Sequence, residues 1–435
     1  MKRFAVALMA LVWFAFPVQA AVEIQDITTP GGIKAWLVEE HSIPFTALEI
    51  SFRGGTVLDR PGKRGEVNLM MATLEEGAGD MDAQGFAKAR DALAASFDFG
   101  AYKDSVTISA RFLTENRDEA MQLLRQALME PRFDQDAVDR VRGQVMSILR
   151  NAETDPGDIA SQAFNTMAFG DHPYGSDDNG TFDSVAGLTR DDMFAAKSRV
   201  MTRDRIYVGA VGDISAQELS TLLDDLLGDL PATGPEVPNR VDPALAGGVT
   251  VVPFETPQSV VIFGQKGIRR DDPDFIPAYI ANEILGGGAD SRLMREVREK
   301  RGLTYGIGAY LVAFDHSELI MGQFSSGNGS VSEAVDVVKQ EWAKIAADGI
   351  TEEELDMAKT YLTGAYALRF DGNGPIARIL VGMQMDGLST DYIATRNDLV
   401  TAVTLEDINR VIKRIYDPQT LTFVVVGQPD GLQTN

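Results

Sequence analysis

The chain has 435 residues, no cysteine and a formal net charge of −24 at pH 7. So strong a negative charge argues against nucleic acid and anionic membranes as partners, and the lack of cysteine excludes disulfides and thiolate metal sites. Residues 1–20 are typical of a signal peptide, with Lys2 and Arg3, an apolar run over 4–16, and Val18-Gln19-Ala20 before the cleavage point. We therefore expect an exported protein, periplasmic or secreted, without membrane insertion; an uncleaved anchor is the alternative.

The rest of the first half alternates strand and helix patterns. Residues 22–57 predict a three-strand meander, because short runs with alternating apolar positions are separated by turn residues. Helical patterns at 65–75 and 82–95 precede a hairpin that turns near Lys103-Asp104, and further helices follow up to residue 200. A buried strand over 205–214 and a helix over 215–228 close this half.

A proline-rich stretch over 231–248 divides the chain. It holds four of the 18 prolines and no periodic pattern, which is typical of a linker. We therefore predict two domains, 21–230 and 249–435. Both contain a helix ending in a glycine cluster, a hairpin with Gly-Ala-Tyr (100–102 and 308–310), and a final apolar strand ending in glycine. This repetition indicates two copies of one unit.

The stretch 283–310 carries the strongest functional pattern. After the glycines 286–288, a helix capped at Asp290 or Ser291 is predicted to end at Gly302, and a strand with Leu303, Tyr305 and Ile307 on one face is predicted to follow. Arg298 and Tyr305 are then one tight turn apart and could point at one oxygen atom, as the carbonyl of a hydrolytic transition state requires. On residue propensities alone, the simpler interpretation is a solvated arginine and a tyrosine packed in the core.

The glycine run, the basic helix and Arg-Glu-Lys-Arg-Gly-Leu-Thr-Tyr (298–305) resemble the second-half motif of pitrilysin/insulinase-type zinc metallopeptidases, the group that includes mitochondrial processing peptidase. The resemblance covers essentially the whole mature chain. It implies an α+β fold of two similar domains, each a mostly antiparallel β-sheet with helices packed on it, arranged as a clam-like pair. It also implies that Arg298 and Tyr305 hold the substrate carbonyl opposite a zinc site. Gly286, Gly287 and Gly288 either expose backbone N–H groups to a substrate strand or form only a tight turn.

The zinc motif of this family is degenerate here. Catalytic relatives carry His-x-x-Glu-His on a first-half helix, whereas the matching positions are Asn68, Met71 and Ala72, which are poor ligands or none. Near the family's downstream carboxylate ligand only Asp139 remains. The chain has three histidines, His41, His172 and His316, and no two of them lie within four residues of each other. We therefore expect no cofactor or metal in this chain, and no peptide cleavage by it alone.

These observations favour a non-catalytic, substrate-binding subunit of a heteromeric zinc metallopeptidase. The expected partner is a homologous subunit with an intact zinc motif, in a heterodimer or a larger assembly, and the expected substrates are peptides. One alternative is a structural or peptide-binding protein of the same fold with no peptidase partner. An autonomous peptidase with unorthodox metal ligands is a third possibility, and the small number of histidines argues against it.

Overall fold

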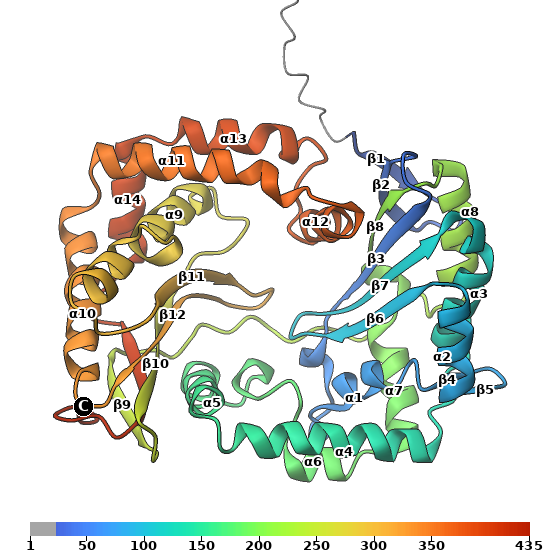
Figure 1. Ribbon diagram of the computed structural model, residues 1–435, viewed down its shortest axis with the longest axis horizontal. Coiled ribbons are helices and arrows are strands. Elements are labelled where there is room, and N and C mark those ends of the chain that lie inside the picture. Colours follow the sequence, from blue (N-terminus) through green and yellow to red (C-terminus); the bar gives the residue numbers. More distant parts are fainter. Residues whose placement is uncertain (1–22) are drawn as a thin grey trace, which may run out of the picture.

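The computed structural model describes residues 23–435, so the predicted signal peptide lies outside the described part. The chain forms two halves, each a β-sheet with helices packed on it, and the halves lie side by side (Figure 1). The predicted α+β fold of two similar, clam-like domains is confirmed. Residues 231–247, within the predicted linker, contain neither helix nor strand, and the second sheet begins at Gly248.

The first sheet has six strands in the order β1-β2-β8-β3-β7-β6. The predicted meander is wrong, because β8 lies between β2 and β3 and pairs parallel with β2. The reason is burial: β8 is almost continuously apolar, and a strand covered on both faces belongs in the centre of a sheet. The strands are β1 (Gln25–Thr28), β2 (Lys34–Glu39), β3 (Phe45–Arg53), β6 (Ser96–Ala101), β7 (Ser105–Leu113) and β8 (Ile206–Gly212).

Helices of the first half cover one face and one end of this sheet (Figure 1). Several begin as the sequence indicates: Ser215 and Glu218, for example, form a capping box at the start of α8. A two-residue ladder, β4 (Gly77–Ala78) with β5 (Met81–Asp82), follows the first helix. The helices are α1 (Glu66–Ala72), α2 (Ala83–Ala92), α3 (Arg117–Met129), α4 (Gln135–Ala152), α5 (Pro156–Phe169), α6 (Phe182–Ala186), α7 (Arg190–Val200) and α8 (Ala216–Leu227).

The second sheet repeats the topology of the first. Its order is β11-β12-β10-β13-β9, which read backwards matches β2-β8-β3-β7-β6, and β9 pairs parallel with β13 as β2 does with β8. The strands are β9 (Gly248–Pro253), β10 (Gln258–Lys266), β11 (Ile307–Ala313), β12 (Glu318–Gly327) and β13 (Thr422–Gly427). The helices are α9 (Phe275–Asn282), α10 (Val331–Asp348), α11 (Glu352–Tyr366), α12 (Asn373–Met385), α13 (Tyr392–Ala402) and α14 (Leu405–Ile415).

One helix of each half packs on the sheet of the other half. Helix α5 of the first half packs on β10 and β13, whereas α12 of the second half packs on β3 and β8. Glycines make this close approach possible: a Cβ added at Gly209 of β8 would lie 2.5 Å from the Ala377 carbonyl oxygen, and one at Gly264 of β10 would lie 2.9 Å from Cζ of Phe164. Leu380 and Met383 of α12 bury their side chains against the first sheet. The exchange therefore ties the halves together through hydrophobic cores.

The β6–β7 and β11–β12 hairpins point toward each other (Figure 1). At their tips the backbone N–H of Asp315 donates a hydrogen bond to the Asp104 carboxylate, at 3.1 Å. Strands β6 and β11 are the edges of their sheets. Each half therefore presents one sheet edge near the junction between the halves.

Candidate functional site

The predicted helix after the glycine run is present, with part of it in π-helical form over Met294–Glu299. Ser291, not Asp290, caps it, since its Oγ accepts a hydrogen bond from the Met294 N–H at 3.4 Å. Gly302 ends it with φ +63°, and its N–H donates to the Arg298 carbonyl. The N–H of Leu303 donates to the Val297 carbonyl at 3.0 Å, so both bonds at this helix end reach one residue further back than those of a Schellman motif.

The strand that follows begins four residues later than predicted. The β-ladder starts at Ile307, and Tyr305 is 90% exposed while Leu303 and Ile307 are buried, so the prediction of one shared face is wrong. The physical reason is that hydrogen bonds of two residues, Leu303 and Thr304, bend the chain before the strand. Leu303 is bonded back to the helix, and the Thr304 hydroxyl bonds both the Gly306 carbonyl (2.9 Å) and the Ser325 carbonyl (2.7 Å).

Tyr305 lines an open groove of about 660 Å³. The groove runs between β11 and β12 on one side and the N-terminus of α5, from Asp155, on the other, and Tyr310 also lines it. Arg298 is exposed in the last turn of its helix and is not among the groove residues. The joint action of Arg298 and Tyr305 on one carbonyl therefore stays a prediction.

The three glycines have different surroundings. A Cβ at Gly286 would lie 2.8 Å from the backbone nitrogen of Ala309, so this glycine lets the loop pack against β11. Added Cβ atoms at Gly287 and Gly288 would each lie 2.5 Å from a carboxylate oxygen of Glu283. Gly286 and Gly287 line a cavity of about 560 Å³, whereas Gly288 lines a smaller one of about 160 Å³. Substrate contact by the run stays a prediction, and packing already explains Gly286.

The cavity of about 560 Å³ is formed by residues that the sequence did not single out. It lies between α9, β11 and α12 and is rich in tyrosine and arginine. No local pattern could have found it, because its side chains come from segments more than a hundred residues apart. Four tyrosines and three arginines line it: Tyr279, Tyr310, Tyr366, Tyr392, Arg270, Arg369 and Arg396.

The degenerate zinc positions do not fit a metal. The Asn68 side chain donates to the Asn179 side chain at 3.0 Å, Met71 is 1% exposed, and Ala72 offers no ligand atom. Asp139 pairs with Arg142 at 2.5 Å. Within residues 23–435 no group of three or more His, Asp or Glu side chains is placed to hold a metal ion.

Ion pairs hold the start of α1 in place. Glu66 is completely buried and accepts hydrogen bonds from Arg60, at 2.7 Å, and from Arg199. Asp59 accepts the backbone N–H groups of Gly65 (2.8 Å) and Val67 (2.9 Å), and burial raises the pKa of its carboxyl to about 6. The helix that would carry a zinc motif is thus positioned by charge pairing within the first half.

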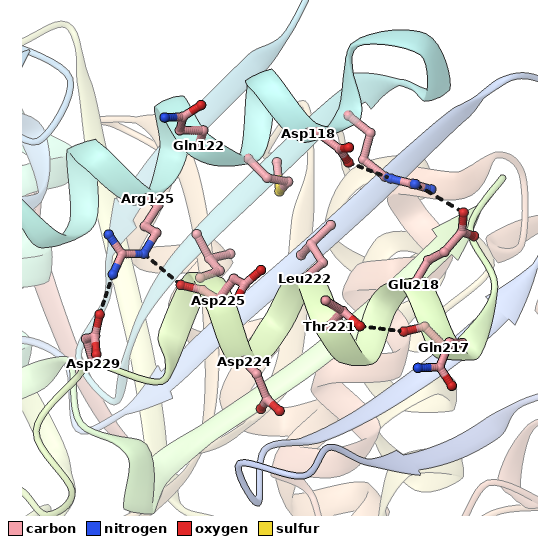
Figure 2. Close-up of a pocket in the computed structure, with 13 residues that line it drawn as sticks. Asp118, Gln122, Arg125, Gln217, Glu218, Thr221, Leu222, Asp224, Asp225 and Asp229 are labelled. Carbon is pink, nitrogen blue, oxygen red and sulfur yellow. Dashed lines mark hydrogen bonds and ion pairs between the residues drawn. The ribbon is translucent and has the colours of Figure 1, made fainter.

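A separate groove of about 780 Å³ lies between α3 and α8 on the outer side of the first half (Figure 2). Its main cations are paired across the groove: Arg117 with Glu218 at 3.1 Å, and Arg125 with Asp229. These pairs join the two helices. None of the predicted site residues lies on α3 or α8.

Comparison with known proteins shows which family the chain resembles. Residues 187–362 match the family model described as the peptidase M16 inactive domain. The chain is 25% identical over 427 residues to the non-peptidase homolog YmxG of Helicobacter pylori, and the match covers 98% of both proteins. A crystal structure of a peptidase M16 inactive domain from Pseudomonas fluorescens is 27% identical, with a TM-score of 0.88 over 94% of this chain and 99% of that one. The chain is thus similar to M16 inactive-domain proteins over nearly its whole length.

Two further proteins resemble the chain over most of its length. An uncharacterized zinc protease, YmxG of Bacillus subtilis, is 22% identical over 90% of this chain and 96% of its own. A protease structure from Helicobacter pylori shares the fold, with 16% identity and a TM-score of 0.83 over 93% of this chain and 99% of that one. The predicted resemblance to the subunit type without the zinc motif is confirmed. Residues 23–435 include no helix with the length and apolar character to cross a membrane.

Proposed function

We propose that this M16 chain is the non-catalytic, substrate-binding subunit of a heteromeric zinc metallopeptidase. The observation that carries the proposal is a contrast between the halves. The first-half helix has Asn68, Met71 and Ala72 in place of the zinc motif, whereas the second half keeps Arg298 and Tyr305, both exposed. A homologous partner would supply zinc, its ligands and the general base. The proposal includes export of the chain, so the complex would work in the periplasm or outside the cell.

The surroundings of Tyr305 suit an extended peptide. The tyrosine lines an open groove beside β11, which is the edge strand of its sheet. Edge strands bind extended peptides through main-chain hydrogen bonds. Gly306 and Gly308 line the same groove and add no side chain to its wall. The chain would thus hold the peptide here while Arg298 and Tyr305 polarise the scissile carbonyl.

Mixing this protein with an M16 subunit that has an intact zinc motif tests the proposal. Peptide cleavage should require both proteins. Arg298→Ala and Tyr305→Phe should each lower kcat by about two to three powers of ten, the usual loss for a donor to a developing oxyanion. Arg378→Ala and Tyr361→Phe are matched controls, because both side chains are exposed and lie outside the groove.

Undiminished cleavage by the double variant Arg298→Ala/Tyr305→Phe would remove the proposed role. Purification from the native source separates the proposal from a structural protein of the same fold. A zinc-bearing M16 subunit should co-elute in stoichiometric amount. Elution without any such subunit would favour a structural or peptide-binding role.

A further inference from the structure

Arg396 of α13 is a buried arginine without an acidic partner. It is only 5% exposed, and within residues 23–435 its hydrogen bonds go to neutral oxygens alone: Nη1 donates to the Leu362 carbonyl (2.8 Å) and to Oδ1 of Asn397 (3.1 Å). Its guanidinium lies 4.6 Å from the ring centre of Tyr366 and 5.8 Å from that of Tyr279. Burying an arginine without an anion is costly, so the site is set up for a negative group from outside the chain.

The cavity that Arg396 lines has room for such a group. It measures about 560 Å³, within the usual range of small-ligand sites, and is lined by residues of α9, β11 and α12. Arg369 lines it as well, is exposed, and has no ion-pair partner among the described residues. Arg270 is already paired with Asp386, at 2.9 Å. Two of the three arginines therefore remain free for a ligand.

The local charge differs in sign from that of the whole chain. Three arginines and two carboxyls, Glu283 and Asp386, line the cavity, which leaves +1 (3 − 2) in a chain of −24. Burial raises the pKa of the Glu283 carboxyl, against the opposite effect of Arg369, and this favours its uncharged form. The two carboxyls of the cavity therefore repel an anion less than two full charges would.

We propose that this cavity binds a peptide carboxylate, with Arg396 and Arg369 as donors and the tyrosine rings covering the residue that carries it. A guanidinium matches a carboxylate with two parallel hydrogen bonds, and tyrosine supplies apolar contact area. The inference rests on the proposed function for its substrate class, peptides. It adds that the chain selects peptides by a free carboxylate, at the C-terminus or on an acidic side chain.

Peptide binding to the isolated full chain tests this by fluorescence anisotropy. The probe is a fluorescein-labelled apolar peptide ending in phenylalanine, made with a C-terminal carboxylate or a C-terminal amide. A third and fourth peptide keep the amide and place glutamate or glutamine before the last residue. The acid should bind at least about tenfold more tightly than the amide, as loss of a charged hydrogen bond predicts. A preference for glutamate over glutamine would assign the side-chain source instead.

Variants identify the donors. Arg396→Gln and Arg369→Gln should each abolish most of the preference for the carboxylate, whereas Arg378→Gln, an exposed arginine of α12 outside the cavity, should leave it intact. Because Arg369 is exposed, Arg369→Gln should fold. It therefore tests the inference even if Arg396→Gln does not fold. Equal binding of all four peptides, or an undiminished preference in Arg369→Gln, would overturn the inference. Partner-dependent cleavage in the mixing experiment decides the proposed function separately.

Discussion

The hydroxyl of Tyr174 donates a hydrogen bond to the Asp104 carboxylate at 2.5 Å, although 70 residues separate them. The same oxygen accepts the backbone N–H of His316 at 3.0 Å. Tyr174 is completely buried and its ring packs against Phe314, with 4.6 Å between ring centres. Because Asp104 and His316 lie at the tips of hairpins from different halves, one phenol joins both halves.

Tyr174→Phe should therefore destabilise the protein. The change leaves the Asp104 carboxylate and the His316 N–H without this partner, and a buried group left unpaired costs about 1–3 kcal/mol. Urea denaturation followed by circular dichroism measures the free energy of unfolding. Tyr102→Phe in the β6–β7 hairpin is the control: Tyr102 is 58% exposed, and a surface change should shift the free energy by less than about 0.5 kcal/mol. Equal effects of the two changes would refute the joining role.

The same junction between the two halves predicts that the stability of the protein depends on pH. Burial raises the pKa of the Asp315 carboxyl above its ordinary value of 3.8, although Arg53 Nε lies 3.1 Å away and acts in the opposite direction. Because the folded-state pKa is the higher one, this group's contribution to stability is full below pH 3.8 and is lost as the pH rises through the raised value.

Asp315→Asn removes that titration. The unfolding free energy of the variant minus that of the wild type should therefore increase as the pH rises above the ordinary aspartate pKa of 3.8. Urea denaturation at several pH values measures this difference, and all other groups cancel in it to a first approximation. A difference that stays constant or falls with pH would contradict the raised pKa.

Glycine at the helix exchange gives a third prediction. Gly209→Ala should lower the free energy of unfolding by about 1–3 kcal/mol, because its Cβ would meet the Ala377 carbonyl oxygen and force α12 away from β8. Gly143→Ala in α4 is the matched control. A Cβ there meets nothing within 4 Å, so alanine should raise the stability by about 0.5–1 kcal/mol. If Gly209→Ala were equally harmless, the close approach would not be needed.

Local patterns in the sequence were sufficient for the repeat and for the ends of several elements. The Gly-Ala-Tyr runs do end β6 and lie within β11, and Gly302 ends its helix because it adopts positive φ. The insertion of β8 between β2 and β3 could not be predicted in this way. It depends on pairing across about 170 residues, which no local periodicity encodes.

Part of the candidate site could likewise be predicted from the sequence, and part of it could not. Gly286, Arg298 and Tyr305 stand in one short motif and could be recognised by resemblance. The bend that exposes Tyr305 could not, since it depends on the bond from the Thr304 hydroxyl to the Ser325 carbonyl of the next strand. The arginine and tyrosine cavity was equally hidden, because helices distant in sequence assemble it.

The last prediction concerns the degenerate zinc helix. Met71 occupies the position of the family's glutamate, yet its side chain is in the core. Met71→Glu places an unpaired carboxylate there and should lower the free energy of unfolding by about 3 kcal/mol or more. Ala72→Glu, one residue further on the same helix, is exposed and should change it by less than about 0.5 kcal/mol. Urea denaturation compares the two, and equal stability of both variants would show that position 71 can still turn toward solvent.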